Sequence, residues 1–135
     1  NSDYALCAAQ WHKELTYSDK FFGNGIKFDK DFNAAYGYAP PYQAAESAAA
    51  LLVWKDAFER ANSLDKDKVR DALATTDMET FYGNVKFGSG GQNTAKPMVL
   101  FQVRCEGDSC ANRLVAPTKW ASHKLVHPTP KWSER

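Results

Sequence analysis

The chain has 135 residues, of which 44% are hydrophobic and 24% are charged. These values are ordinary for one globular domain, so they exclude a disordered, collagen-like or coiled-coil chain. The formal net charge is +1 with acids and bases interspersed, so no nucleic-acid partner is expected. The uncharged stretch 47–54 is far shorter than the about 20 apolar residues that a bilayer requires, so no membrane insertion is expected either.

The first third of the chain alternates apolar runs with glycine-marked breaks. Residues Tyr4–Ala9 are apolar and few, which predicts a buried strand that ends at a loop. The aromatic and glycine-rich mixture over 16–26 predicts an irregular loop. Helical spacing of Phe28, Phe32 and Ala35 then predicts a short amphipathic helix with Gly37 as its stop.

The strongest helix prediction covers Tyr42–Ala61, about five turns, because a Pro-Pro pair precedes it and no glycine or proline interrupts it. No charge lies on any side of this helix between Ser47 and Trp54. We therefore expect it to be covered over most of its circumference, packed between a sheet and neighbouring helices. Ser63 or Asp65 is expected to cap a further helix, whose apolar stripe comprises Val69, Ala72 and Leu73.

The second half of the chain is typical of turns and strands. The composition predicts a turn, a short strand at 84–87, a glycine-rich turn, and a long strand over 97–105 that pairs with 113–117. The tail from Thr118 is expected to be irregular, with Trp54, Trp120 and Trp132 as anchors of the fold.

Cys105 and Cys110 flank four residues of turn composition, so they can face each other across a hairpin. A disulfide, or two free thiols, is favoured above a metal site, because a C-x4-C pair with only distant histidines is a weak zinc pattern. Catalytic patterns are equally weak. The run Gly88-Ser89-Gly90-Gly91 lacks the Lys-Ser/Thr of a P-loop and leads into a strand, and no nucleophile motif accompanies the histidines. We expect neither enzyme activity nor a cofactor.

Several segments, taken in order, carry a family resemblance. They include Asp65-x-x-Lys68-Val69, the closing Pro128-x-Pro130-x-Trp132 and, most specific, T-F-x-G-x-V-x-F over Thr80–Phe87 followed by Gly91-Gln92-Asn93. Gly83 permits a tight bend there and Gly91 a positive φ. Together the segments resemble the C-terminal part of type I periplasmic solute-binding proteins of the branched-chain amino acid and amide kind, called Liv-type.

The resemblance implies an α/β chain that forms part of a two-lobe type I periplasmic-binding-protein fold, incomplete as 135 residues. Residues 1–96 would supply an inter-lobe crossing strand and the C-terminal part of lobe I. Residues 97–135 would supply the third crossing and the terminal hairpin and tail of lobe II. A missing N-terminal portion of the same protein would then be one partner.

The resemblance also implies a site between the lobes. Gln10 and Trp11 follow the crossing strand, where they can hydrogen-bond or wall a ligand, although Trp11 can equally pack against the loop. Tyr42 and Gln43 begin the long helix at its cleft end, where a capping and packing role is the alternative. Glu46 can receive a substrate ammonium, against the general preference of acids for helix N-termini.

The function that follows is that of an extracytoplasmic binding component, periplasmic or extracellular, which holds a small solute in an inter-lobe cleft and delivers it to an ABC permease. The first alternative keeps the fold but places it in a sensory receptor ectodomain. A small stand-alone α/β enzyme is the second alternative.

Overall fold

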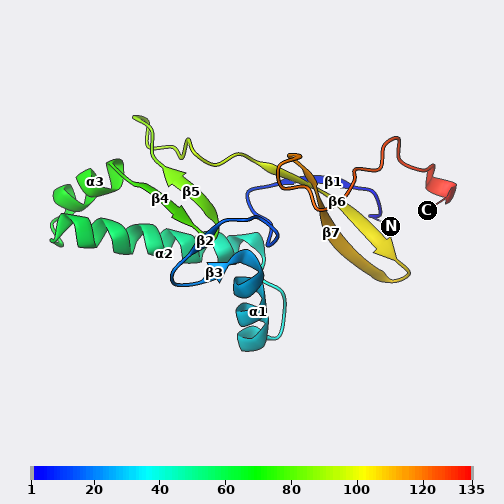
Figure 1. Ribbon diagram of the computed structural model, residues 1–135, viewed down its shortest axis with the longest axis horizontal. Coiled ribbons are helices and arrows are strands. Elements are labelled where there is room, and N and C mark those ends of the chain that lie inside the picture. The colour runs from blue at the N-terminus through cyan, green and yellow to red at the C-terminus, as the bar shows by residue number, and fades with distance from the viewer. Residues whose placement is uncertain (1, 135) are drawn as a thin grey trace.

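The computed structural model describes residues 2–134 and combines helices with short antiparallel strands (Figure 1). A body of helices and two small hairpins lies at one end, and a long hairpin lies at the other. No helix in the described residues is long and apolar enough to cross a membrane. The elements in chain order are β1 (Leu6–Ala9), β2 (Ser18–Asp19), β3 (Gly23–Asn24), α1 (Gly25–Tyr36), α2 (Tyr42–Ala61), α3 (Lys66–Ala74), β4 (Asp77–Thr80), β5 (Gly83–Lys86), β6 (Val99–Glu106), β7 (Ser109–Ala116) and a 3-10 turn at Trp132–Glu134.

The helix predictions are confirmed at the C-terminal end of α1 and at both ends of α2. Helix α1 ends at Gly37, whose φ of 79° is a left-handed stop, and α2 runs for the predicted 20 residues. The cap of α3 is Asp65, whose carboxylate accepts the backbone N–H groups of Asp67 and Lys68. Ser63 does not cap this helix; its hydroxyl instead accepts the N–H of Asp65 at 3.0 Å.

Three antiparallel sheets organise the strands. The largest has the order β1-β6-β7, with Leu6 opposite Gln102 and Ala9 opposite Val99. Strands β4 and β5 form a hairpin whose tight bend has Gly83 at φ 142°. The predicted loop over 16–26 is wrong in part, because β2 pairs with β3 and α1 already begins at Gly25. The Asp19 carboxylate closes that turn by accepting two backbone N–H groups at 2.8 and 2.9 Å.

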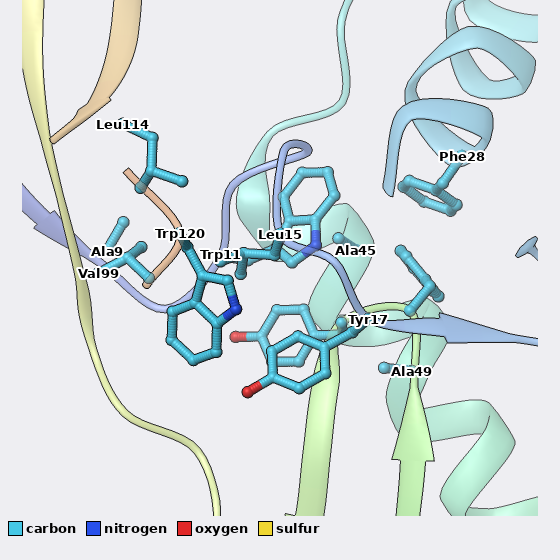
Figure 2. Close-up of a cluster of buried hydrophobic side chains, with 12 residues drawn as sticks. Ala9, Trp11, Leu15, Tyr17, Phe28, Ala45, Ala49, Val99, Leu114 and Trp120 are labelled. Atoms are coloured by element: carbon cyan, nitrogen blue, oxygen red, sulfur yellow. The ribbon is translucent and has the colours of Figure 1, made fainter. Parts of the chain in front are cut away.

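The core lies where the three-stranded sheet meets the helical body (Figure 2). Trp11 makes edge-to-face contacts with Phe28 and with the fully buried Phe81, with ring centroids 6.1 and 6.2 Å apart. Tyr17 and Trp120 approach each other from the sheet side, with ring centroids at 5.3 Å. This aromatic cluster joins the two ends of the molecule.

Three expectations about burial are wrong. Helix α2 is buried along one stripe, from Ala45 to Ala57, and Leu51 on its other side is 69% exposed, because the described residues supply cover on one side only. Strand β1 is exposed except at Ala9, because it is an edge strand paired with β6 alone. Of the three tryptophans expected to anchor the fold, Trp120 is buried, whereas Trp54 and Trp132 are exposed.

Candidate ligand-binding site

The start of α2 carries three of the residues that the sequence singled out. Tyr42, Gln43 and Glu46 lie within its first two turns and are all exposed. Pro41 provides no side-chain cap and the first turn carries no acidic residue. The positive end of the helix dipole is therefore not neutralised by a side chain of its own first turn, which suits a polar or anionic ligand group.

Two further residues join this group from the chain that follows β4. Tyr82 lies in the β4–β5 turn and is 7% exposed; the pKa of its hydroxyl is raised by burial first and then by the nearby Glu46 and Tyr42. The amine of Lys96 lies 2.8 Å from the centroid of the Tyr82 ring. Burial lowers the pKa of Lys96 to about 7, although Glu46 acts in the opposite direction. Tyr42, Glu46, Tyr82 and Lys96 therefore form one aromatic and charged group.

The sequence reasoning missed Tyr82 and Lys96. Tyr82 stands inside the T-F-x-G motif at a variable position, so nothing in the motif pointed to it. Lys96 is a single lysine in a predicted connection, and isolated lysines are normally solvated. The adjacent Gly83 is the one available signal, since a glycine can mark a place where another group approaches closely.

Gln10 and Trp11, the two predicted site residues that follow β1, have different surroundings. Gln10 is exposed, and its amide donates to the sulfur of Met98 at 2.8 Å. Trp11 is 6% exposed and belongs to the same core cluster as Ala45 and Tyr82. Trp11 therefore packs in the core of the described residues, and its indole N–H has no hydrogen-bond acceptor among them.

A large apolar hollow of about 760 Å³ opens beside Glu46 and Tyr82. Helix α2, helix α3 and strand β5 supply its walls, and the glycine-rich turn that follows β5 supplies its rim. Its apolar lining residues include Ala49, Val53, Trp54, Leu73, Val85 and Phe87. On α2 the lining comes from Glu46 to Trp54, so the hollow lies beside the first two thirds of this helix.

One cluster contains the residue types of a hydrolase triad. The Ser122 hydroxyl donates to the Glu14 carboxylate and contacts His123 Nδ1 at 2.9 Å. In a working triad the histidine stands between the nucleophile and the acid, whereas here the serine stands between the acid and the histidine. Among residues 2–134 no three His, Cys, Asp or Glu side chains are grouped as metal ligands.

The end of the β6–β7 hairpin carries the cysteine pair. Cys105 and Cys110 lie directly opposite each other in the register, with Cα atoms 4.0 Å apart, and are joined by a disulfide. Cys7 on β1 is a free, exposed thiol. The disulfide therefore closes a local turn and does not link distant parts of the chain.

The comparison with protein families matches residues 3–109 to the periplasmic binding protein family. The chain belongs to this family. The match includes β1, all three α-helices and β6, so it covers both the start of α2 and the paired strands β1 and β6.

Solved structures of similar fold agree with this assignment. The leucine-binding protein LivK from Thermotoga maritima matches 87% of the chain with a TM-score of 0.63 and 20% identity. The branched-chain amino acid transporter substrate-binding protein LivJ from Streptococcus pneumoniae, solved with isoleucine, matches 83% with a TM-score of 0.61 and 18% identity. An ABC transporter solute-binding protein from R. palustris, solved with benzoate, matches 92% with a TM-score of 0.57 and 18% identity.

The chain spans about a third of these structures, namely 32%, 30% and 34% of their lengths. The fold is accordingly α/β and forms part of the type I periplasmic-binding-protein fold, as the sequence resemblance predicted. The family is that of periplasmic binding proteins, and the fold is shared with solved proteins that are described as leucine-binding and as substrate-binding.

Proposed function

We propose that this chain forms part of the solute-binding component of an ABC transporter and holds one wall of a cleft for a small organic solute. The observation that carries the proposal is the family match over residues 3–109, with an aromatic and charged group at the start of α2 inside it. Aromatic walls with a few placed polar groups are the usual make-up of small-molecule sites. Solved relatives of this fold hold isoleucine or benzoate, which makes amino acids and small carboxylic acids the first solutes to test.

The pairing of β1 with β6 supports the proposed division into lobes at residue 96. In that division these two strands are the second and third crossings, and a hinge requires crossings that run side by side. Four residue pairs from Leu6–Gln102 to Ala9–Val99 join them. The helical body on one side and the β6–β7 hairpin on the other would then be pieces of lobe I and lobe II (Figure 1).

The open apolar surface supports a further portion of the same protein as partner. Leu51, Trp54 and Phe58 are exposed on α2, and Trp54 also lines the hollow of about 760 Å³. An apolar area of this kind is costly to leave in water and marks a face that another element covers. We propose that the rest of lobe I packs here, and that the complete protein docks on an ABC permease.

A periplasmic or extracellular location is proposed on the same basis. The disulfide between Cys105 and Cys110 fits an oxidising compartment, in which such bonds form and persist. The family name points to the same place.

Calorimetry with two polypeptides tests the function. The 135-residue chain alone should bind leucine, isoleucine or benzoate negligibly, because one exposed wall cannot exclude water. A longer polypeptide that carries both lobes should bind one solute of this kind tightly. Micromolar binding by the short chain would contradict the need for a second lobe, and no binding by the longer chain to any amino acid, amide or small acid would contradict the function.

Variants of the longer polypeptide test the site. Tyr42→Ala should weaken binding by more than about 1 kcal/mol, since the loss of a buried aromatic contact is rarely smaller. Tyr38→Ala is the matched control, because Tyr38 is an exposed tyrosine whose ring contacts are with Phe32 and Tyr36. Glu46→Gln should weaken an amino acid more than benzoate if Glu46 receives an ammonium. Trp11→Ala also removes core packing, so its effect must be compared with its stability.

A further inference from the structure

Lys96 stands in an unusual place for a lysine. Its amine is shielded from solvent and has no hydrogen-bond partner among the described residues. The amine lies on the face of the Tyr82 ring, 2.8 Å from its centroid. A lysine normally keeps its amine in water while its stem lies along apolar surface, and here the amine itself is buried.

The space that Lys96 occupies exists because residue 83 is a glycine. A Cβ atom added at Gly83 would lie 2.9 Å from both Cδ and Cε of Lys96, closer than real Cβ atoms approach. Gly83 also has φ 142°, in a region that other residues rarely adopt. Gly83 and the Tyr82 ring therefore form a packing site for the Lys96 stem on the β4–β5 turn. We call this site the seat, and we call Lys96 seated when its side chain lies there.

The seated lysine holds a particular stretch of chain. Thr94 N–H donates to the Lys86 carbonyl at 2.9 Å, and Val99 begins the pairing of β6 with β1. Lys96 lies in the extended stretch between these two fixed points. Its side chain joins the stretch to the β4–β5 turn.

The charge on the Lys96 amine determines how stable the seated position of the side chain is. Burial disfavours the charged form, while the Glu46 carboxylate and the Tyr82 ring face favour it. Tyr42 is the other titratable group near Tyr82. Burial is the largest effect and brings the pKa of the seated amine to about 7, below the ordinary 10.5 of a lysine.

We propose that the charge on Lys96 controls the position of the 95–98 stretch. The Lys96 side chain holds this stretch on the β4–β5 turn when its amine is neutral and releases it on protonation, a contact that we call the pin. The direction follows from linkage: the released lysine binds its proton more tightly than the seated lysine. Seating is therefore strongest above pH 10.5, weakens as the pH falls towards about 7, and changes no further below that value. One proton is involved, so the seating equilibrium changes by at most about tenfold per pH unit.

Nuclear magnetic resonance on the 135-residue chain tests the pin directly. The ring current of Tyr82 should shift the Lys96 side-chain protons upfield while the lysine is seated. The upfield shift should shrink as the pH is lowered from about 10 to about 7, and then stay constant. Glu46→Gln should weaken seating of the neutral amine little and lower the pKa of the seated amine further, because the Glu46 charge raises it.

Two variants complete the test. Lys96→Met keeps an apolar stem without a titrating amine, so the shift of its side-chain protons should be independent of pH. Lys66→Met, at an exposed lysine that begins α3, should leave the behaviour of Lys96 unchanged. Lys96 protons that are never ring-shifted, or that keep their full shift while the amine takes up its proton, would overturn the pin.

The consequence for solute binding rests on the proposed function, whereas the pin itself does not. If the stretch is the third crossing between lobes, binding by the longer polypeptide should depend on pH between about 7 and about 10 in the wild type and less so in Lys96→Met. A pin that titrates as described without any effect on solute binding would count against the proposed hinge and leave the pin intact.

Discussion

Replacing Phe81 by alanine is the sharpest test of the core that joins the two ends of the molecule. Phe81 is fully buried, stacks on Phe28 with centroids 4.4 Å apart, and meets the rings of Trp11 and Phe22 at 6.2 and 5.2 Å. A buried Phe→Ala change costs about 3–5 kcal/mol from lost transfer energy and the cavity that remains. Three ring partners place this position in the upper half of the range, at about 4 kcal/mol.

Urea unfolding followed by circular dichroism measures this cost. With a slope of about 2 kcal/mol per molar urea, the midpoint should fall by about 2 M, or the variant should already be unfolded in buffer. Phe21→Ala is the matched control, because Phe21 is 49% exposed and should cost less than about 1 kcal/mol. Equal midpoints for the two variants would refute the reasoning that the aromatic cluster carries the fold.

Three further changes have smaller expected effects on the free energy of unfolding, each measured by the same urea titration. Asp65→Ala removes the α3 cap and should cost about 1 kcal/mol, whereas Asp65→Asn should restore most of it. Reduction of the Cys105–Cys110 disulfide opens a loop of only a few residues and should cost about 2 kcal/mol by loop-closure entropy, an effect absent from the double serine variant. Burial lowers the pKa of His12 below its ordinary 6.5, against the opposing effect of Glu14, so stability should fall as the pH drops below 6.5; in His12→Gln this dependence should be weaker.

Helices and strands with strong local patterns could be predicted from the sequence. The bounds of α2 follow from an alanine-rich run after two prolines, and α1 stops where a glycine permits a left-handed residue. Strands β6 and β7 follow from apolar composition on either side of a turn. Strand β4 was missed, because Asp77–Thr80 is largely polar and pairs through its backbone with β5.

Burial could not be predicted in the same way. The run from Ser47 to Trp54 lacks charge, which indicates that these residues of α2 are to be buried. The pattern does not say whether the elements that bury them belong to these 135 residues. Part of the candidate site had the same problem. Tyr42 and Glu46 were found from their place at a helix start, whereas Tyr82 and Lys96 come together only because the β4–β5 hairpin folds against α2.

The segment after β1 limits how two lobes could move in the proposed function. Trp11 in this segment packs on Phe81 of the helical body. Two other residues of the segment contact the C-terminal tail. Glu14 accepts from Ser122, and the ring of Tyr17 lies against Trp120 in the tail. A free hinge would separate these two sets of contacts and expose the aromatic cluster to water, at a cost of about 25 cal/mol for each Å² of apolar surface. Closure with this geometry therefore favours a small shear of packed side chains along the segment, which keeps the cluster covered while the lobes shift.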